Sequence, residues 1–124
     1  MNQTTRDKVF QKYGGKCAYS GTLLEDDWQV DHLVSKNHGK IDTLENLMPC
    51  QKIINHYKRG LWLDDFRNIW VGKLHIRLLK LPKDPKVERS VKRKAYILKV
   101  AGYFGIMPDK PFCGKFYFET LRKD

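Results

Sequence analysis

The feature that most restricts the fold is a break in helical periodicity across the middle of the chain, from residue 16 to residue 48. Short β-favouring segments take the place of the helical pattern there, and polar turns such as the one at residues 36–40 separate them. These segments cover residues 16–19, 28–34 and 44–48. Because helical patterns lie on both sides of this region, the sequence predicts an α+β fold with a small hairpin.

The helices predicted next to this region are short. One is expected from residue 4 or 5 to residue 13, capped by a threonine and ended by a pair of glycines. The other opens at Pro49 and ends at Gly60. Its apolar face is expected to pack into the core through Ile53, Ile54 and Tyr57.

Two longer helices are predicted in the second half, followed by a closing strand. The first begins at Asp64 or Asp65 and continues to residue 81, because Pro82 prevents its continuation. The second follows the turn 82–85 and ends near Gly102. It is expected to turn four apolar side chains inward, namely Val87, Val91, Ala95 and Leu98. The aromatic residues 113–119 predict a C-terminal strand.

Length and composition indicate one domain over residues 1–124, with a front module at about 16–60 and a basic helical extension at about 61–124. A hydrophobic fraction of 41% is enough to build a core in a chain of this size. The chain has no apolar run long enough for a membrane span and no apolar secretory segment, so a cytoplasmic location is expected. Its three widely spaced cysteines are interpreted as reduced thiols.

The positive charge is concentrated in one part of the chain. The formal net charge is +10, and residues 72–99 carry ten Lys or Arg against two acidic residues, which accounts for +8 of it. Cations in such excess cannot all be paired internally, and they favour a polyanionic partner because each neutralised phosphate releases counterions. Nucleic acid is therefore the expected partner, although a merely solvated helix face remains an alternative.

Residues suited to metal binding and acid–base chemistry gather between residues 30 and 58. Asp31 and His32 are adjacent, Asn46 follows fourteen positions after His32, and Asn55 follows nine positions later. A hairpin followed by a helix could bring them together. Adjacent strand residues point to opposite faces, however, so Asp31 and His32 would diverge unless a turn or a metal uses both.

This set matches what phosphodiester hydrolysis requires. Asp31 and Asn55 offer oxygen ligands for Mg²⁺ or Mn²⁺, and His32 can accept a proton from water near neutral pH. Asn46 could hold the imidazole in orientation. Asn46 could instead cap a turn, and Asn55 could be an ordinary surface amide.

Several blocks of the sequence resemble the HNH endonuclease family, in particular its small phage-type members. They are "KYGGKCAYSGTLL", "WQVDHLVSK", "DTLENLMPC", "INHYKRGLWLDDFR" and the terminal "FYFE". The spacing of the acid–base residues also resembles that of the HNH domain in RNA-guided CRISPR nucleases. The resemblance implies a ββα-metal module with flanking helices, in which a hairpin and a short helix hold one divalent cation. For a phage protein, the expected location would be the host cytoplasm.

The resemblance also implies a role for each residue of the set. His32 would be the general base, Asn46 its orienting residue, and Asp31 and Asn55 the ligands of one divalent cation, with Mg²⁺ expected and Mn²⁺ as the alternative. His56 is the reserve metal ligand. The DNA contacts are expected from the basic residues Lys58, Arg59, Lys73, Arg77, Arg89, Lys92, Arg93 and Lys94.

The chain departs from the family at the positions of its structural zinc. Many relatives carry two C-x-x-C pairs, whereas Cys17 is followed here by Ser20, and the second pair falls on Gln51 and Ile54. Structural zinc requires four ligands, so no structural zinc is expected.

These features predict a metal-dependent endonuclease that nicks DNA one strand at a time, as a monomer or weak homodimer without membrane contact. The alternative is a non-catalytic DNA-binding or inhibitory phage protein of HNH-like fold, and a basic RNA-associated protein is a third possibility.

Overall fold

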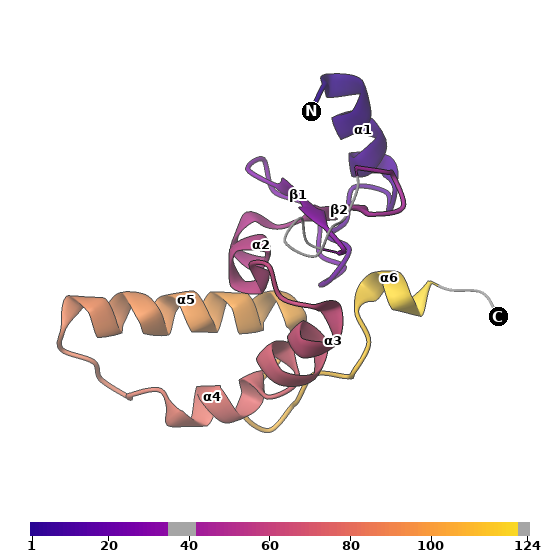
Figure 1. Ribbon diagram of the computed structural model, residues 1–124. Helices are drawn as coiled ribbons and strands as arrows, with labels where there is room; N and C mark the ends of the chain where they lie inside the picture. Colours follow the sequence, from indigo (N-terminus) through magenta and orange to yellow (C-terminus); the bar gives the residue numbers. More distant parts are fainter. Residues whose placement is uncertain (35–41, 122–124) are drawn as a thin grey trace.

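The computed structural model describes residues 1–34 and 42–121, and within them a two-stranded sheet and several helices form a mixed α+β fold, as predicted (Figure 1). Strands β1 (Gln29–His32) and β2 (Leu47–Cys50) pair in antiparallel register, with Asp31 opposite Met48 and His32 opposite Leu47. The expected hairpin is therefore present. The turn predicted at residues 36–40 lies outside the described residues.

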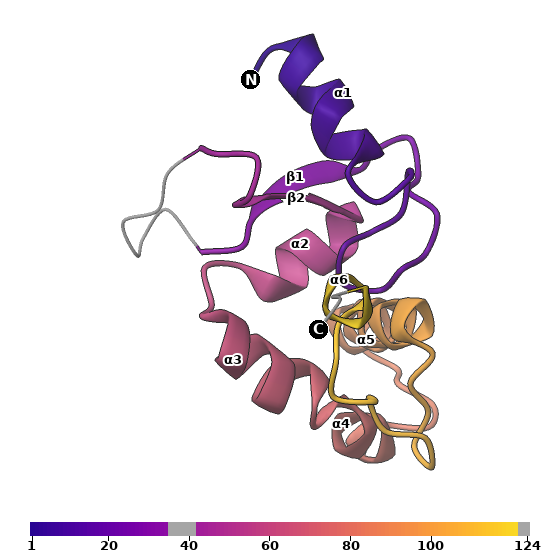
Figure 2. The same cartoon turned by 90° about the vertical axis from the view of Figure 1, so that its right-hand side faces the viewer.

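The two faces of this hairpin are covered by different helices. Helix α1 (Gln3–Gln11) lies on one side and helix α2 (Lys52–Lys58) on the other (Figure 2). On the α1 side, Leu47 packs with Val9 and Trp28. On the α2 side, Met48 and Cys50 join the larger buried cluster. Alternation along each strand thus separates β1 residues into two environments.

Both short helices begin at residues other than those predicted. Helix α1 starts earlier because the Asn2 side chain accepts a hydrogen bond from the Thr5 amide at 2.8 Å, which makes Asn2 the cap. Pro49 pairs with Val30 inside β2, and α2 starts only at Lys52. The first predicted strand, residues 16–19, is reduced to a single bridge between Lys16 and Leu23.

The long helix predicted up to residue 81 is divided into three pieces. They are α3 (Leu63–Asp65), the π-helix η2 (Phe66–Val71) and α4 (Leu74–Lys80). The division after η2 falls at Gly72, where an added Cβ would lie 2.5 Å from the Asn68 carbonyl oxygen. Only glycine allows this close approach of backbone to backbone.

Helix α5 (Glu88–Phe104) is present, but the predicted inward face is wrong. Val87 is 65% exposed, Val91 45% and Leu98 48%, and Ala95 is exposed as well. A second apolar stripe faces the core instead, formed by Ile97, Val100 and Ala101. The helix also continues past the predicted end near Gly102, to a left-handed Gly105.

The predicted C-terminal strand is wrong, because this segment contains the short helix α6 (Tyr117–Thr120). The aromatic residue before it, Phe116, is fully buried and stacks on Phe66 with ring centroids 5.3 Å apart. The backbone amides of Tyr117 and Phe118 donate to the carbonyls of Tyr19 and Ala18. Burial of the Phe116 ring and these two backbone hydrogen bonds therefore hold the segment, and it forms no strand.

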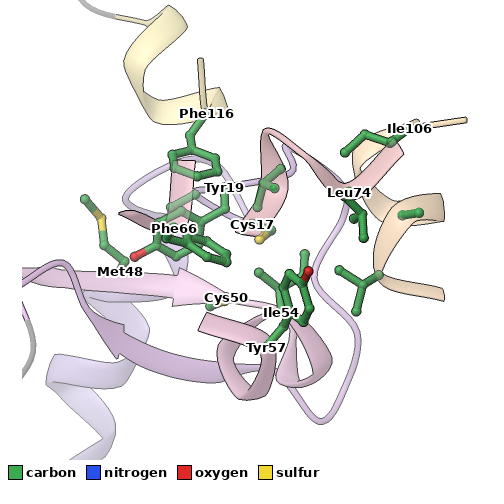
Figure 3. Close-up of a cluster of buried hydrophobic side chains, with 14 of the residues drawn as sticks. Cys17, Tyr19, Met48, Cys50, Ile54, Tyr57, Phe66, Leu74, Ile106 and Phe116 are labelled. Atoms are coloured by element: carbon green, nitrogen blue, oxygen red, sulfur yellow. The ribbon is translucent and has the colours of Figure 1, made fainter. Parts of the chain in front are cut away.

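The main core draws side chains from nearly all of these elements. Figure 3 shows Tyr19, Phe66 and Phe116 together, with Ile54 of α2 and Leu74 of α4 nearby. Within residues 1–34 and 42–121, no helix combines the length and the apolar character needed to cross a membrane.

Candidate functional site

Asp31 is the buried acidic residue of the α2-facing side of β1. Its side chain is only 8% exposed, and its Oδ2 accepts a hydrogen bond from the Tyr19 hydroxyl at 2.5 Å. The Lys58 ammonium lies 3.1 Å from the same oxygen. Both contacts fall on Oδ2, so among the described residues Oδ1 keeps its capacity for a further ligand.

Lys58 is not placed to contact DNA, contrary to the prediction. Its side chain is fully buried, and its ammonium donates to the His32 carbonyl oxygen at 3.1 Å as well as pairing with Asp31. A buried ammonium requires such partners, because an unpaired charge in the interior is strongly unfavourable. Lys58 therefore joins the end of α2 to β1 and is withdrawn from any phosphate at the surface.

Tyr19 is a residue of this site that the sequence did not indicate. Burial raises the pKa of its hydroxyl well above the ordinary value, and the Asp31 carboxylate raises it further. The hydroxyl is therefore protonated at neutral pH and donates to Asp31. No local pattern connects residue 19 to residue 31, since only the tertiary fold brings them together.

Asn55 lies, like Asp31, where helix α2 packs against strand β1. We call this contact, with Asp31, Asn55 and Lys58, the seam between α2 and β1. Its Nδ2 donates to the Gln29 side-chain oxygen at 2.8 Å, and Gln29 shares a face of β1 with Asp31 because strand side chains repeat every two residues. On α2, Asn55 and Lys58 are three residues apart and share a helix face. The contact with Gln29 uses the side-chain nitrogen Nδ2. The side-chain oxygen Oδ1 of Asn55 therefore remains the atom that could bind a cation.

His32 lies on the opposite face of the strand from Asp31. It is the last residue of β1 and pairs with Leu47, which belongs to the α1-side cluster. Its side chain is 20% exposed, and its Nε2 lies 2.8 Å from Oδ1 of Asp42. The structure therefore does not bring the imidazole directly to the Asp31 carboxylate. Asp42, which the sequence did not indicate, is a partner that can fix the orientation of the ring.

Asn46 acts on the backbone that follows His32. Its Oδ1 accepts from the Val34 amide at 2.9 Å, its Nδ2 donates to the Val34 carbonyl at 3.2 Å, and its own carbonyl accepts from the Leu33 amide at 2.8 Å. These contacts hold the backbone that directly follows His32. The role of Asn46 in orienting the His32 ring stays a prediction.

His56, the reserve metal ligand, faces away from the Asp31 seam. Its Nδ1 lies 2.8 Å from the Tyr96 hydroxyl of α5, and the two rings meet edge to face. It lines a hollow of about 280 Å³ with Glu25 and Asp27, on the α5 side of α2. The structure therefore does not bring His56 together with Asp31 and Asn55.

The donor set available for a cation is small. Among residues 1–34 and 42–121, no group of three or more His, Cys, Asp or Glu side chains converges in a way that could hold a metal. Asp31 Oδ1 and the Asn55 carbonyl oxygen are two hard oxygen donors on one seam. Oxygen donors are the ligands that Mg²⁺ takes from proteins, usually one or two carboxylates, while water and phosphate oxygens complete its coordination.

The other residues predicted to contact DNA lie nearer the surface, but in different surroundings. Arg59 is exposed and lies over the Trp70 ring, at 5.1 Å from its centroid. Lys92 pairs with Glu88 at 2.9 Å, and the Lys94 ammonium donates to the Lys83 carbonyl. Arg89 is exposed. The remaining three, Lys73, Arg77 and Arg93, line one common hollow.

Two cysteines and the polar side chain of Gln51 lie buried together behind the hairpin. Cys17 and Cys50 are both fully buried, and the Gln51 side chain donates to the Leu23 carbonyl at 2.7 Å. Burial alone raises the pKa of the Cys17 thiol, but hydrogen bonds from Cys50 and Ser20 outweigh burial and lower that pKa to about 6. Burial and the neighbouring Cys17 raise the pKa of Cys50.

The α2 side of the hairpin thus carries the oxygen donors of Asp31 and Asn55, and the imidazole of His32 lies on the other face, at the end of β1. Comparisons with protein-family models, with curated proteins and with solved structures found no match to this chain.

Proposed function

We propose that this chain is a metal-dependent endonuclease of the HNH type that hydrolyses phosphodiester bonds in DNA, one strand at each site. The observation that carries the proposal is the seam between α2 and β1. There Asp31 and Asn55 come from a strand and from the helix that follows the hairpin, and each keeps one oxygen for a further ligand. A hairpin followed by a helix is also the order of elements that the resemblance implies.

Asp31 and Asn55 would hold the cation, which supplies charge neutralisation at the scissile phosphate. Lys58 keeps the other oxygen of Asp31 in place, and Tyr19 donates to that same oxygen. The carboxylate is thereby fixed in position before substrate arrives, so little reorganisation is needed on binding.

His32 would act as the general base. With Nε2 donating its proton to Asp42, the Nδ1 atom of the neutral ring is the one that can accept a proton from water. The resulting hydroxide would attack phosphorus, the bond to the leaving 3′ oxygen would break, and that oxygen would take a proton from solvent water. Because His32 and Asp31 point to opposite faces, the substrate phosphate has to lie across the end of β1, where the two residues are adjacent in the chain.

The test is nicking of supercoiled plasmid with Mg²⁺ or Mn²⁺, with and without EDTA. The His32→Ala variant is expected to lose about a hundredfold to ten-thousandfold in rate, which is the usual contribution of a positioned general base. The Asn55→Ala variant should require more metal for the same rate. The His56→Gln variant is the matched control on the same helix, because its ring faces Tyr96. Unchanged nicking by His32→Ala would contradict the assignment.

A second candidate function is a non-catalytic DNA-binding or inhibitory protein of the same fold. The observation that favours it is the Lys58–Asp31 pair, which places an ammonium on the carboxylate that a catalytic cation would need. This candidate predicts retardation of DNA without metal-dependent nicking, and the same plasmid assay separates the two. Equal or tighter binding of RNA would favour an RNA-associated protein instead.

A further inference from the structure

A groove between α4 and α5 collects cations from both helices. Lys73, Arg77 and Lys80 reach it from the α4 side and Arg93 from α5, around a hollow of about 560 Å³. Figure 1 shows α4 running beneath α5, with the turn between them at one end. We call this hollow the α4–α5 groove. No acidic residue is among the described residues that line it.

Among the described residues, no acidic side chain forms an ion pair with these four cations. In the described ranges 1–34 and 42–121, the ion pairs of the basic segment are Lys86 with Asp84 and Lys92 with Glu88, and both lie outside the groove. Arg77 has a neutral partner, since its guanidinium donates to the Tyr57 hydroxyl at 2.7 Å. Four like charges around one hollow repel each other, and an external polyanion would relieve that repulsion.

The floor of the groove is apolar and partly open to solvent. Ile69 is 49% exposed and Ile76 40%, and Trp70 lies beside them, half-buried. The Trp70 ring meets Tyr57 edge to face, with ring centroids 6.0 Å apart. The guanidinium groups of Arg59 and Arg77 lie over it at 5.1 and 5.9 Å from its centroid, so a base would contact the part of this half-buried ring that they leave open. A small anion such as phosphate would bind the cations but would leave this apolar surface exposed to water. A nucleotide could do both, because its phosphate can contact the cations while the face of its base covers the apolar side chains.

This combination distinguishes single-stranded from duplex nucleic acid. A duplex presents phosphates on its outside while its base faces are stacked within, so it could satisfy Lys73 and Lys80 but could not cover Ile76 or Trp70. A single strand offers phosphates and unstacked base faces along the same stretch of backbone.

We propose that the α4–α5 groove binds a single-stranded segment of nucleic acid, with phosphates on its four cations and a base against Trp70 and Ile76. This deepens the proposed function and rests on nucleic acid being the partner, but it does not depend on cleavage. Binding is therefore measured in EDTA, where no metal-dependent cutting occurs.

The first test compares labelled oligo(dT) of about 12 nucleotides with a duplex of the same length. The full chain should bind oligo(dT) more tightly, and a duplex bound at least as tightly would overturn the proposal.

The salt dependence of binding tests the cations of the groove. Lys73→Gln/Lys80→Gln should lower the slope of log affinity against log salt by about 1.4, since each single-strand phosphate contact contributes about 0.7. The matched control is Lys110→Gln/Lys115→Gln, which removes the same charge from exposed positions outside the groove. An equal loss in the control pair would also overturn the proposal.

The second test isolates the base contact without relying on a substitution in the core. An abasic oligomer keeps the phosphates and lacks the bases, so the full chain should bind it about 5- to 100-fold more weakly than oligo(dT). Ile76→Ser, at an exposed position, should reduce that preference. Equal binding of the two oligomers would overturn the groove assignment even if plasmid nicking proceeds. Loss of nicking with the preference intact would overturn the endonuclease and leave the groove assignment standing.

Discussion

The α2-facing side of the hairpin and the α4–α5 groove both contain charge, but they differ in whether it is paired. At the hairpin, Lys58 and Asp31 are buried and directly paired. In the groove, Lys73 and Arg93 remain open, and no acidic residue is among the described lining residues. Removing one member of the buried pair would leave an uncompensated charge in the interior, whereas the unpaired charge of the groove is what the proposal above assigns to nucleic acid. The candidate metal seam should therefore respond to mutation mainly in stability, and the groove mainly in binding.

The largest expected effect comes from breaking the buried pair. Lys58→Met should lower the free energy of unfolding by about 3–5 kcal/mol, because it leaves the Asp31 carboxylate buried without its counter-charge. Denaturant unfolding measures this loss. Lys52→Met, at an exposed position of the same helix, is the control and should change stability by less than about 0.5 kcal/mol.

A double variant tests the cause of that loss. Asp31→Leu/Lys58→Met removes both charges and should recover much of the stability lost in Lys58→Met alone. A double variant no more stable than Lys58→Met would show that packing of the lysine stem, and not the unpaired carboxylate, dominates. The contrast between paired and unpaired charge would then be wrong for this site.

Removal of the Tyr19 hydroxyl should have a smaller effect on the same carboxylate. Tyr19→Phe loses one hydrogen bond to a charged group while Lys58 remains, so the expected cost is about 1.5–3 kcal/mol. Tyr13→Phe is the matched control, because within the described part of the chain the Tyr13 hydroxyl reaches only the Met48 sulfur, at 3.7 Å. Thioether sulfur is a weak acceptor. Equal losses in the two variants in denaturant unfolding would argue against a special role for Tyr19.

The buried thiols next to this seam predict a pH dependence of stability. The pKa of Cys17 is lowered from 9.0 to about 6 in the folded chain, after its hydrogen bonds outweigh burial. Between these values the unfolded chain binds the extra proton, so stability should rise with pH, by at most about 1.4 kcal/mol per pH unit, and fall toward pH 6. Cys17→Ala should flatten this dependence, and Cys113→Ala, at an exposed position, should not. A thiolate absorbance titration with its midpoint near 9 would contradict the expectation.

Local patterns were sufficient to locate the hairpin and helix α5 and to place part of the candidate site. The loss of helical period located the hairpin. Gln29 and Asp31 are two residues apart on β1 and share a strand face, and Asn55 and Lys58 are three residues apart on α2 and share a helix face. These spacings place Asp31 and Asn55 on one seam. The alternation of strand side chains also anticipated that Asp31 and His32 would diverge. These features depend on residues close together in the chain, so sequence spacing carries them.

Contacts made by tertiary docking were not accessible in the same way. Helix α5 carries two apolar stripes, and only its packing against α2 and α4 decides that Ile97 and Val100 are buried while Val91 and Leu98 are exposed. The partners of Asp31 likewise come from the loop before β1 and from the end of α2. The closing segment had the composition of a strand, but burial of Phe116 in the core determined its course.

The smallest expected effect is that of an ion pair in the open region, and it sharpens the contrast with Lys58. Lys92 pairs with Glu88 one turn away on α5, and both side chains are more than three-quarters exposed. Lys92→Gln should cost about 0.3–0.5 kcal/mol at low salt, since such pairs gain little Coulomb energy in water. This cost should disappear at high salt, because screening removes what remains of the attraction. Lys58→Met should keep most of its cost under the same conditions, because salt does not reach a buried pair. If both losses shrank in parallel with added salt, the ammonium of Lys58 would have to be accessible to ions, and the distinction between the paired interior and the open groove would fail.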